Sequence, residues 1–118
     1  MNDIDNKLCS LSKSRFRSNF HLNKDMKEYV KVKGMDKIRE HAFSFINNRL
    51  KPDYPKNDGK QTPMKGHPVF IAQHACACCC RTCLEKWHHI PRYQELTTVE
   101  VSYIVNLLME WIEIEMTK

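Results

Sequence analysis

Residues 96–112 constrain the fold of this 118-residue chain more than any other segment. Thr97 and Glu100 have the spacing of a capping box, and Leu96 is placed to pack on Val101 as a hydrophobic staple. Beyond the cap, apolar residues recur at helical spacing on one face: Val101, Ile104, Val105, Leu108 and Ile112. This pattern predicts a long C-terminal helix with one face to bury.

Two further helices are predicted in the first half of the chain. Asn23 can cap one of them and Gly34 can end it, since these residue types are favoured at helix N- and C-termini respectively. Another helix follows at once and stops before Pro52. Its apolar positions fall at helical spacing: Ile38, Ala42, Phe45, Ile46 and Leu50.

Residues 51–68 are predicted to form a long loop, because they contain four prolines and two glycines and show no periodicity. Loops of about 15 residues or more inside a compact domain are usually functional or disordered. Ala and Cys then occupy every position from 75 to 80, which favours a tightly packed helix. The sequence thus predicts an all-α fold of about four helices, with one long functional loop before the third. We assign residues 1–15 to a flexible N-terminal arm and residues 16–118 to a single helical domain.

The composition is that of a soluble globular protein, with 42% hydrophobic and 28% charged residues. No apolar run reaches the roughly 18 residues of a transmembrane helix, and the N-terminal residues lack the features of a signal peptide. We therefore expect a cytoplasmic protein with no membrane partner. Since the cytosol keeps thiols reduced, clustered cysteines there point to metal binding or catalysis more than to disulfides.

The formal net charge of +5 is unevenly distributed. Residues 1–68 hold 15 Lys and Arg against 8 Asp and Glu, whereas residues 69–118 hold 4 against 6. A basic half points to an anionic partner such as nucleic acid, phosphate or an acidic protein. The alternative is an ordinary solvated surface, since the lysines are scattered and form no run.

Residues 74–89 hold five of the six cysteines and three of the six histidines. Cys80 and Cys83 have the C-x2-C spacing of half a structural zinc site, although a second pair at the usual separation is missing. On one continuous helix, His74 and His88 would lie about 21 Å apart and could not share an ion. A site for one metal ion therefore requires a break in the helix before Cys83 or a ligand from elsewhere, for which His67 is the best candidate.

Two other interpretations of the cluster remain open. On an unbroken helix, one stripe would contain Cys76, Cys80, Cys83 and Trp87. A stripe of this kind is also typical of a buried face, because free cysteine is among the most buried residue types. The other interpretation is a reactive thiol, because cations such as Arg81 and Lys86 lower the pKa of a nearby thiol. Cys83 and His88 form the nucleophile and base pair to test.

The block NDGKQTPMKGHPVFIAQHACACCCRTCLEKWHHIP, residues 57–91, resembles the signature of the bacterial domain-of-unknown-function family 4186, whose members are small single-domain proteins. The resemblance extends from residue 16 through the last predicted helix. The matching positions are Asp58, Gly59, Lys60, Gln61, Thr62, Pro63, His67, Pro68, Gln73, His74, Cys79, Cys80, Cys83, Lys86, Trp87 and His88. At Cys76 and Cys78 the family more typically carries a small hydroxyl residue such as Thr, which implies that these two are small packed side chains. The resemblance implies no activity.

We combine these observations into one functional hypothesis, a zinc-binding helical module that recognises an anionic partner, with nucleic acid as the first candidate. The functional surface is the loop of residues 57–68 folded against the cluster of residues 73–88. The resemblance narrows the candidate metal ligands to Cys79, Cys80, Cys83, His67, His74 and His88. The candidate anion-binding residues are Lys60, Lys65 and Arg81, and further phosphate contacts are expected at Arg15 and Arg17. The candidate substrate or partner loop contains Asp58, Gly59, Gln61 and Gln73.

Two alternatives come from other functional classes. The first is a small enzyme in which one of the three cysteines is a nucleophile and His67, His74 or His88 is its base, with Lys60 and Gln61 binding the substrate. The second is a metal-free interaction domain in which the thiols are simply buried.

Overall fold

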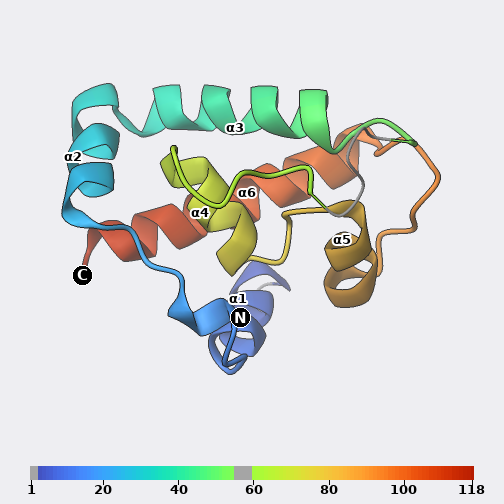
Figure 1. Ribbon diagram of the computed structural model, residues 1–118, viewed down its shortest axis with the longest axis horizontal. Helices are drawn as coiled ribbons and strands as arrows, with labels where there is room; N and C mark the ends of the chain where they lie inside the picture. The colour runs from blue at the N-terminus through green and yellow to red at the C-terminus, as the bar shows by residue number, and fades with distance from the viewer. Residues whose placement is uncertain (1–2, 55–59) are drawn as a thin grey trace.

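The computed structural model describes residues 3–54 and 60–118, and over these residues the protein is all-α, as predicted, with no strand. The described chain contains six α-helices and one 3-10 helix, so the expected number of about four is wrong. The α-helices are α1 (Asp3–Ser12), α2 (Lys24–Lys33), α3 (Met35–Arg49), α4 (Pro68–Ala75), α5 (Arg81–His88) and α6 (Thr98–Met116), and the 3-10 helix is η1 (Arg17–Asn19) (Figure 1). None of these helices combines the length and the apolarity that crossing a bilayer requires.

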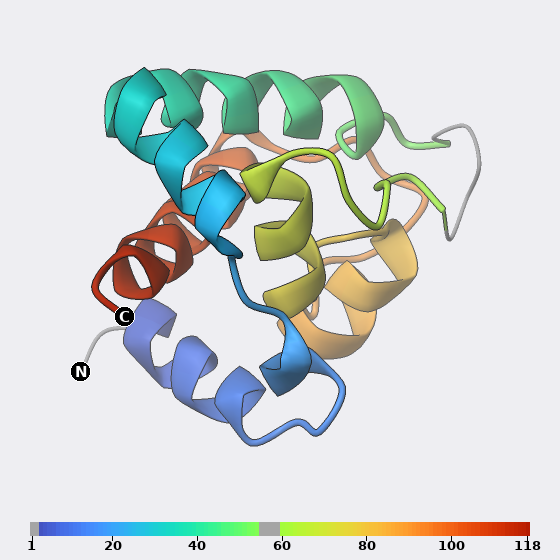
Figure 2. The ribbon, with the colours of Figure 1, turned by 60° about the vertical axis from the view of Figure 1, so that its left-hand side comes forward.

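Helix α6 is the central element of the fold. Helices α1, α3 and α4 all pack against it (Figures 1 and 2). Its predicted N-terminus is confirmed, since Thr97 N–H donates to Glu100 Oε1 at 2.9 Å and Glu100 N–H donates to Thr97 Oγ1 at 3.1 Å. The predicted apolar face is also confirmed, because all five of its residues and Leu96 are buried.

Helices α2 and α3 form as the sequence predicts. The Asn23 side chain accepts from Met26 N–H at 2.8 Å at the start of α2. Gly34 ends α2 and begins α3 in a backbone conformation with φ +85°, which glycine adopts at little cost. The face of α3 that meets α6 is fully buried at Ile38, Ala42 and Ile46.

The segment expected to be an N-terminal arm contains helix α1, which packs on α6. Ile4, Leu8 and Leu11 recur at helical spacing, and all three belong to the hydrophobic core or pack against it. Asp3 and Asp5 lie in the first turn, where a negative charge is favourable to the helix dipole. Three apolar side chains in a polar stretch were too weak a pattern to predict this helix.

The long loop between α3 and α4 is confirmed over residues 51–54 and 60–67. It is fixed at its start by the buried Arg81 at the beginning of α5. The Arg81 guanidinium donates to the carbonyl oxygens of Leu50 and Pro52 at 3.0 and 2.8 Å. It also donates to those of Pro91 and Gln94, at 2.9 and 2.6 Å. Arg81 thus ties this loop to the connection between α5 and α6.

Candidate metal centre

The five residues between α4 and α5 form a turn, so the helix predicted over residues 75–80 is wrong beyond Ala75, the last residue of α4. Helix α4 ends in a Schellman motif, in which Cys78 N–H donates to Gln73 O at 2.7 Å and Ala77 N–H donates to His74 O at 3.4 Å. Ala77 takes the left-handed conformation, with φ +58°, that this motif usually gives to glycine. The turn supplies the break in the helix that a site for one metal ion requires.

The turn brings three thiols together at the start of α5. The sulfur atoms of Cys79, Cys80 and Cys83 all lie within 4.8 Å of one another. Cys80 is the N-cap of α5, and its sulfur accepts from Cys83 N–H at 3.4 Å. Cys79 and Cys83 have sulfur atoms 3.6 Å apart. Cys79 and Cys80 are buried, whereas Cys83 is half-buried, so the cluster reaches solvent through Cys83.

A buried arginine lies against this cluster. Arg17, at the start of η1, donates from Nη2 to Cys83 Sγ at 3.2 Å and from Nη1 to Cys79 Sγ at 3.6 Å. Nη1 also donates to the carbonyl oxygen of His74 at 2.6 Å. Arg17 is only 8% exposed, and no carboxylate of the described residues forms an ion pair with it. A buried cation needs a negative partner, and here the sulfur atoms supply it.

The three thiols differ in their readiness to ionise. Hydrogen bonds from Cys79 and Cys80, followed by the interaction with Arg17, hold the pKa of Cys83 well below its usual value. Hydrogen bonds with Cys80 and Cys83 raise the pKa of Cys79. Of the three thiols, Cys83 is therefore the one that ionises most readily, and it is the one that receives the Arg17 Nη2 donor at 3.2 Å.

Cys76 and Cys78 are the small packed side chains that the family resemblance implies. Both are fully buried, and burial raises the pKa of each thiol, so both remain neutral. Cys78 Sγ donates to the carbonyl oxygen of Cys76 at 3.4 Å. Neither residue belongs to the group of three thiols.

His67 and His74, two of the candidate ligands, are not brought into the thiol group. His67 is the N-cap of α4, where its Nδ1 accepts from Val69 N–H at 3.0 Å, and its Nε2 lies 3.0 Å from Nδ1 of His41. His74 Nε2 donates to the carbonyl oxygen of Pro63 at 3.0 Å.

His88 also lies outside the thiol group, because both of its ring nitrogens bind elsewhere. Its Nε2 donates to the carbonyl oxygen of Cys76 at 2.8 Å, so Nδ1 is the acceptor for the hydroxyl of Tyr103 at 3.0 Å. Cys78 Sγ lies 3.6 Å from His88 Nε2. The cation that contacts the Cys83 sulfur is therefore Arg17, and no histidine of the described chain is hydrogen-bonded to this sulfur.

The loop packs against the cluster, as predicted, over its described residues. Thr62 Oγ1 donates to the carbonyl oxygen of Cys79 at 2.7 Å. Gln73 Nε2 donates to Thr62 Oγ1 at 3.1 Å and to the carbonyl oxygen of Cys78 at 3.2 Å. Gln61 is buried beside Thr62 in the chain, whereas Asp58 and Gly59 lie outside the described residues. The loop thus supports the turn that carries Cys79.

The expected phosphate contacts divide into exposed and buried residues. Lys60, Lys65 and Arg15 are exposed, as a phosphate contact requires. Arg81 is only 2% exposed, and its guanidinium is occupied by four carbonyl oxygens, so it does not face a phosphate. Arg17 likewise faces inward, toward the thiols. No local pattern indicated this role, because Arg17 is more than 60 residues away from Cys79 and Cys83 in the sequence.

Comparison with known proteins places the chain in a family. The model of a family described as a domain of unknown function (DUF4186) matches residues 5–113. The chain belongs to this family. The DUF4186 match includes Arg17, the loop and all three thiols of the centre, and it begins inside α1. No solved structure matches the chain.

Proposed function

We propose that this DUF4186 protein is a zinc-binding module whose ion is held by the thiolates of Cys79, Cys80 and Cys83. The observation that carries the proposal is the convergence of three sulfur atoms within 4.8 Å, next to a buried guanidinium. Thiolate is a preferred ligand of zinc, and structural zinc sites commonly use a C-x2-C pair at the start of a helix or turn. Cys80 and Cys83 have that spacing, and Cys79 adds the third sulfur.

The charge of the centre supports a divalent ion. Three thiolates and one Zn²⁺ carry a net charge of −1, which the Arg17 guanidinium balances. Burial favours such a neutral group of ions over a charged one. N–H donors to ligand sulfur atoms are also typical of the surroundings of metal sites, where they orient the ligands. Arg17 supplies two of these donors, from Nη1 to Cys79 and from Nη2 to Cys83.

Three protein ligands leave one position of a tetrahedral zinc ion for water or an external ligand. The wider hypothesis, recognition of an anionic partner such as nucleic acid, is supported by the exposure of Lys60 and Lys65 on the loop that supports the turn. It remains separate from the metal proposal, because each can hold without the other.

The metal proposal is tested by elemental analysis of the purified chain. We expect about one zinc per chain and a lower unfolding temperature after treatment with a chelator, because a structural ion stabilises the fold that binds it. Cys83→Ser should lose stoichiometric zinc. Cys9→Ser is the matched control, since Cys9 is exposed and lies outside the thiol group. It should keep the full zinc content.

A chain without stoichiometric metal that also binds no added zinc in a competition titration would contradict the proposal. So would a Cys83→Ser variant that binds zinc as tightly as the parent protein.

A further inference from the structure

Two thiols of the centre, Cys79 and Cys83, lie close enough to form a disulfide after a small movement. Cys79 and Cys83 have sulfur atoms 3.6 Å apart, and a disulfide bond requires a separation of about 2 Å. Cys79 lies in the turn and Cys83 in the first turn of α5, so a small shift of the turn brings the atoms together. Cys83 is the more exposed of the pair and is therefore the thiol that a dissolved oxidant reaches.

We propose that the centre is also a site of reversible oxidation, where a hydroperoxide closes a Cys79–Cys83 disulfide and expels the metal. The expulsion rests on the proposed zinc site, whereas the disulfide does not. In the first step, the sulfur of Cys83 attacks the peroxide, the O–O bond breaks, and the products are a sulfenic acid and an alcohol or water. In the second step, the sulfur of Cys79 attacks Cys83, and a disulfide forms as water leaves with the thiol proton.

Oxidation has a consequence for Arg17. Both sulfur atoms to which Arg17 donates enter the disulfide, which carries no charge. Of its contacts with described residues, the buried guanidinium then keeps the carbonyl oxygen of His74 and the ring of Phe16, 4.9 Å away, and neither carries a negative charge. A buried cation without a counter-charge is strongly unfavourable. We therefore expect η1, which begins at Arg17, to move away from the turn when the disulfide closes.

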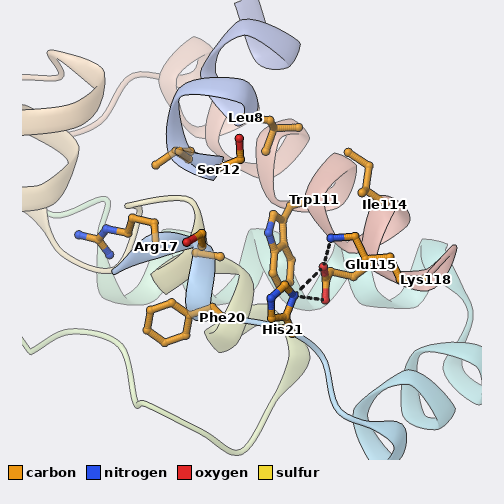
Figure 3. Close-up of a pocket in the computed structure, with 12 residues that line it drawn as sticks. Leu8, Ser12, Arg17, Phe20, His21, Trp111, Ile114, Glu115 and Lys118 are labelled. Carbon is orange, nitrogen blue, oxygen red and sulfur yellow. Dashed lines mark hydrogen bonds and ion pairs between the residues drawn. The ribbon is translucent and has the colours of Figure 1, made fainter. Parts of the chain in front are cut away.

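The movement of η1 should be detectable through the nearby Trp111. A cavity of about 280 Å³ lies next to η1, lined by Phe20, Ala75, Trp111 and Glu115 among others, with the aliphatic part of Arg17 on one side. Figure 3 shows the Arg17 guanidinium pointing away from Trp111 and Glu115. A displacement of η1 therefore changes the surroundings of the Trp111 indole. Tryptophan emission detects this change once the second tryptophan, Trp87 of α5, is replaced by Phe in the test protein.

The test uses the full zinc-loaded chain with Trp87→Phe and with Cys9→Ser, which removes the exposed thiol outside the cluster. Hydrogen peroxide should release about one equivalent of zinc to a chromogenic chelator, consume two thiols and shift the tryptophan emission. All three changes should reverse when dithiothreitol and zinc are added. Trypsin cleaves after Arg81, so mass spectrometry without reduction should find Cys83 linked to the peptide that ends at Arg81.

Two matched variants identify the partner of Cys83 in the metal-free protein. Cys80→Ser should still close the disulfide, whereas Cys79→Ser should not. A third variant, Arg17→Met, has no buried cation to expel, so its disulfide should close without the shift in emission. The emission change is thus assigned to Arg17 and not to the disulfide itself.

Three results would overturn the inference: an unchanged thiol count after peroxide, irreversible oxidation of Cys83 without a disulfide, or a disulfide that forms in Cys79→Ser and not in Cys80→Ser. Failure of the zinc proposal would give a result that can be told apart from these three. In that case the disulfide closes as described in a chain that never held stoichiometric metal, which supports the oxidation and removes the zinc site.

Discussion

Two buried arginines show how single residues organise this protein. Arg17 is 8% exposed and Arg81 is 2% exposed, although arginine is almost never fully buried without partners. Arg17 uses sulfur atoms as its counter-charge, and Arg81 uses four carbonyl oxygens. Sequence reasoning treated both as surface cations, because their partners are distant in the chain. The burial of a charge depends on contacts that only the folded chain creates.

Replacing Arg81 by lysine should destabilise the protein despite the conserved charge. The planar guanidinium reaches four oxygens in two directions, whereas an ammonium group cannot satisfy all of them and leaves some of these carbonyl oxygens without a donor. We expect the free energy of unfolding to fall by about 2 to 4 kcal/mol, measured by urea denaturation. Lys86→Arg is the control on the exposed side of α5 and should change it by less than about 0.5 kcal/mol. Equal effects of the two substitutions would contradict this role for Arg81.

Two half-buried histidines, His67 and His88, should make stability depend on pH. Burial, followed by the neighbouring His41, lowers the pKa of His67 to about 4. Burial likewise lowers the pKa of His88 to about 4. Unfolded histidine takes up a proton near pH 6.5, so the unfolded state binds more protons between pH 6.5 and 4. The stabilisation is therefore complete above pH 6.5 and falls as the pH drops from 6.5 toward 4.

This dependence can be measured with urea midpoints at pH 7.5 and 5.5, in the presence of a chelator so that metal binding does not contribute. His67→Asn keeps an N-cap acceptor for α4 but has no titrating ring. Its midpoint should fall less than that of the parent protein over this range. An equal fall of the urea midpoint in both proteins would show that His67 does not contribute to the pH dependence of stability.

At the scale of elements, α6 and the turn after α4 show what the sequence could and could not predict. The N-terminus and the buried face of α6 are local patterns, since a capping box spans four residues and the face recurs with the period of the helix. The turn after α4 ends a helix with Ala77 at the position where glycine is the usual signal. The three thiols could be named as candidates from the sequence, but their convergence depends on this turn and could not be predicted.

The capping box of α6 should contribute measurably to stability. Thr97→Ala removes the acceptor for Glu100 N–H and should lower the free energy of unfolding by about 1 kcal/mol. Thr98→Ala is the control, because Thr98 is the adjacent exposed residue and its side chain does not cap the helix. Its effect should stay below about 0.5 kcal/mol in the same urea titration. A control as destabilising as Thr97→Ala would show that the loss does not come from the cap.

The cations of the basic half of the molecule are not all available to a partner. The formal charge counts Arg17 with the others, but its charge faces the thiols. Lys60 and Lys65 are exposed on the loop that packs beside the centre, and Lys24 and Lys31 are exposed on α2. Phe16, next to Arg17, is 56% exposed, so it offers an aromatic surface on which a base could stack.

If the loop lysines contact nucleic acid, binding should weaken steeply with salt, because each neutralised phosphate of a duplex releases counterions and adds about −0.9 to the log–log slope. Lys60→Ala with Lys65→Ala should therefore reduce the slope by roughly 1.8, read from titrations of labelled oligonucleotides at several salt concentrations. Lys24→Ala with Lys31→Ala changes the net charge equally and should leave the slope nearly unchanged.

Phe16→Ala should weaken binding to single strands more than to duplexes, since stacking needs an unpaired base. No binding at low salt, or binding that does not vary with salt, would contradict nucleic-acid recognition and favour a protein or small-molecule partner at the thiol cluster.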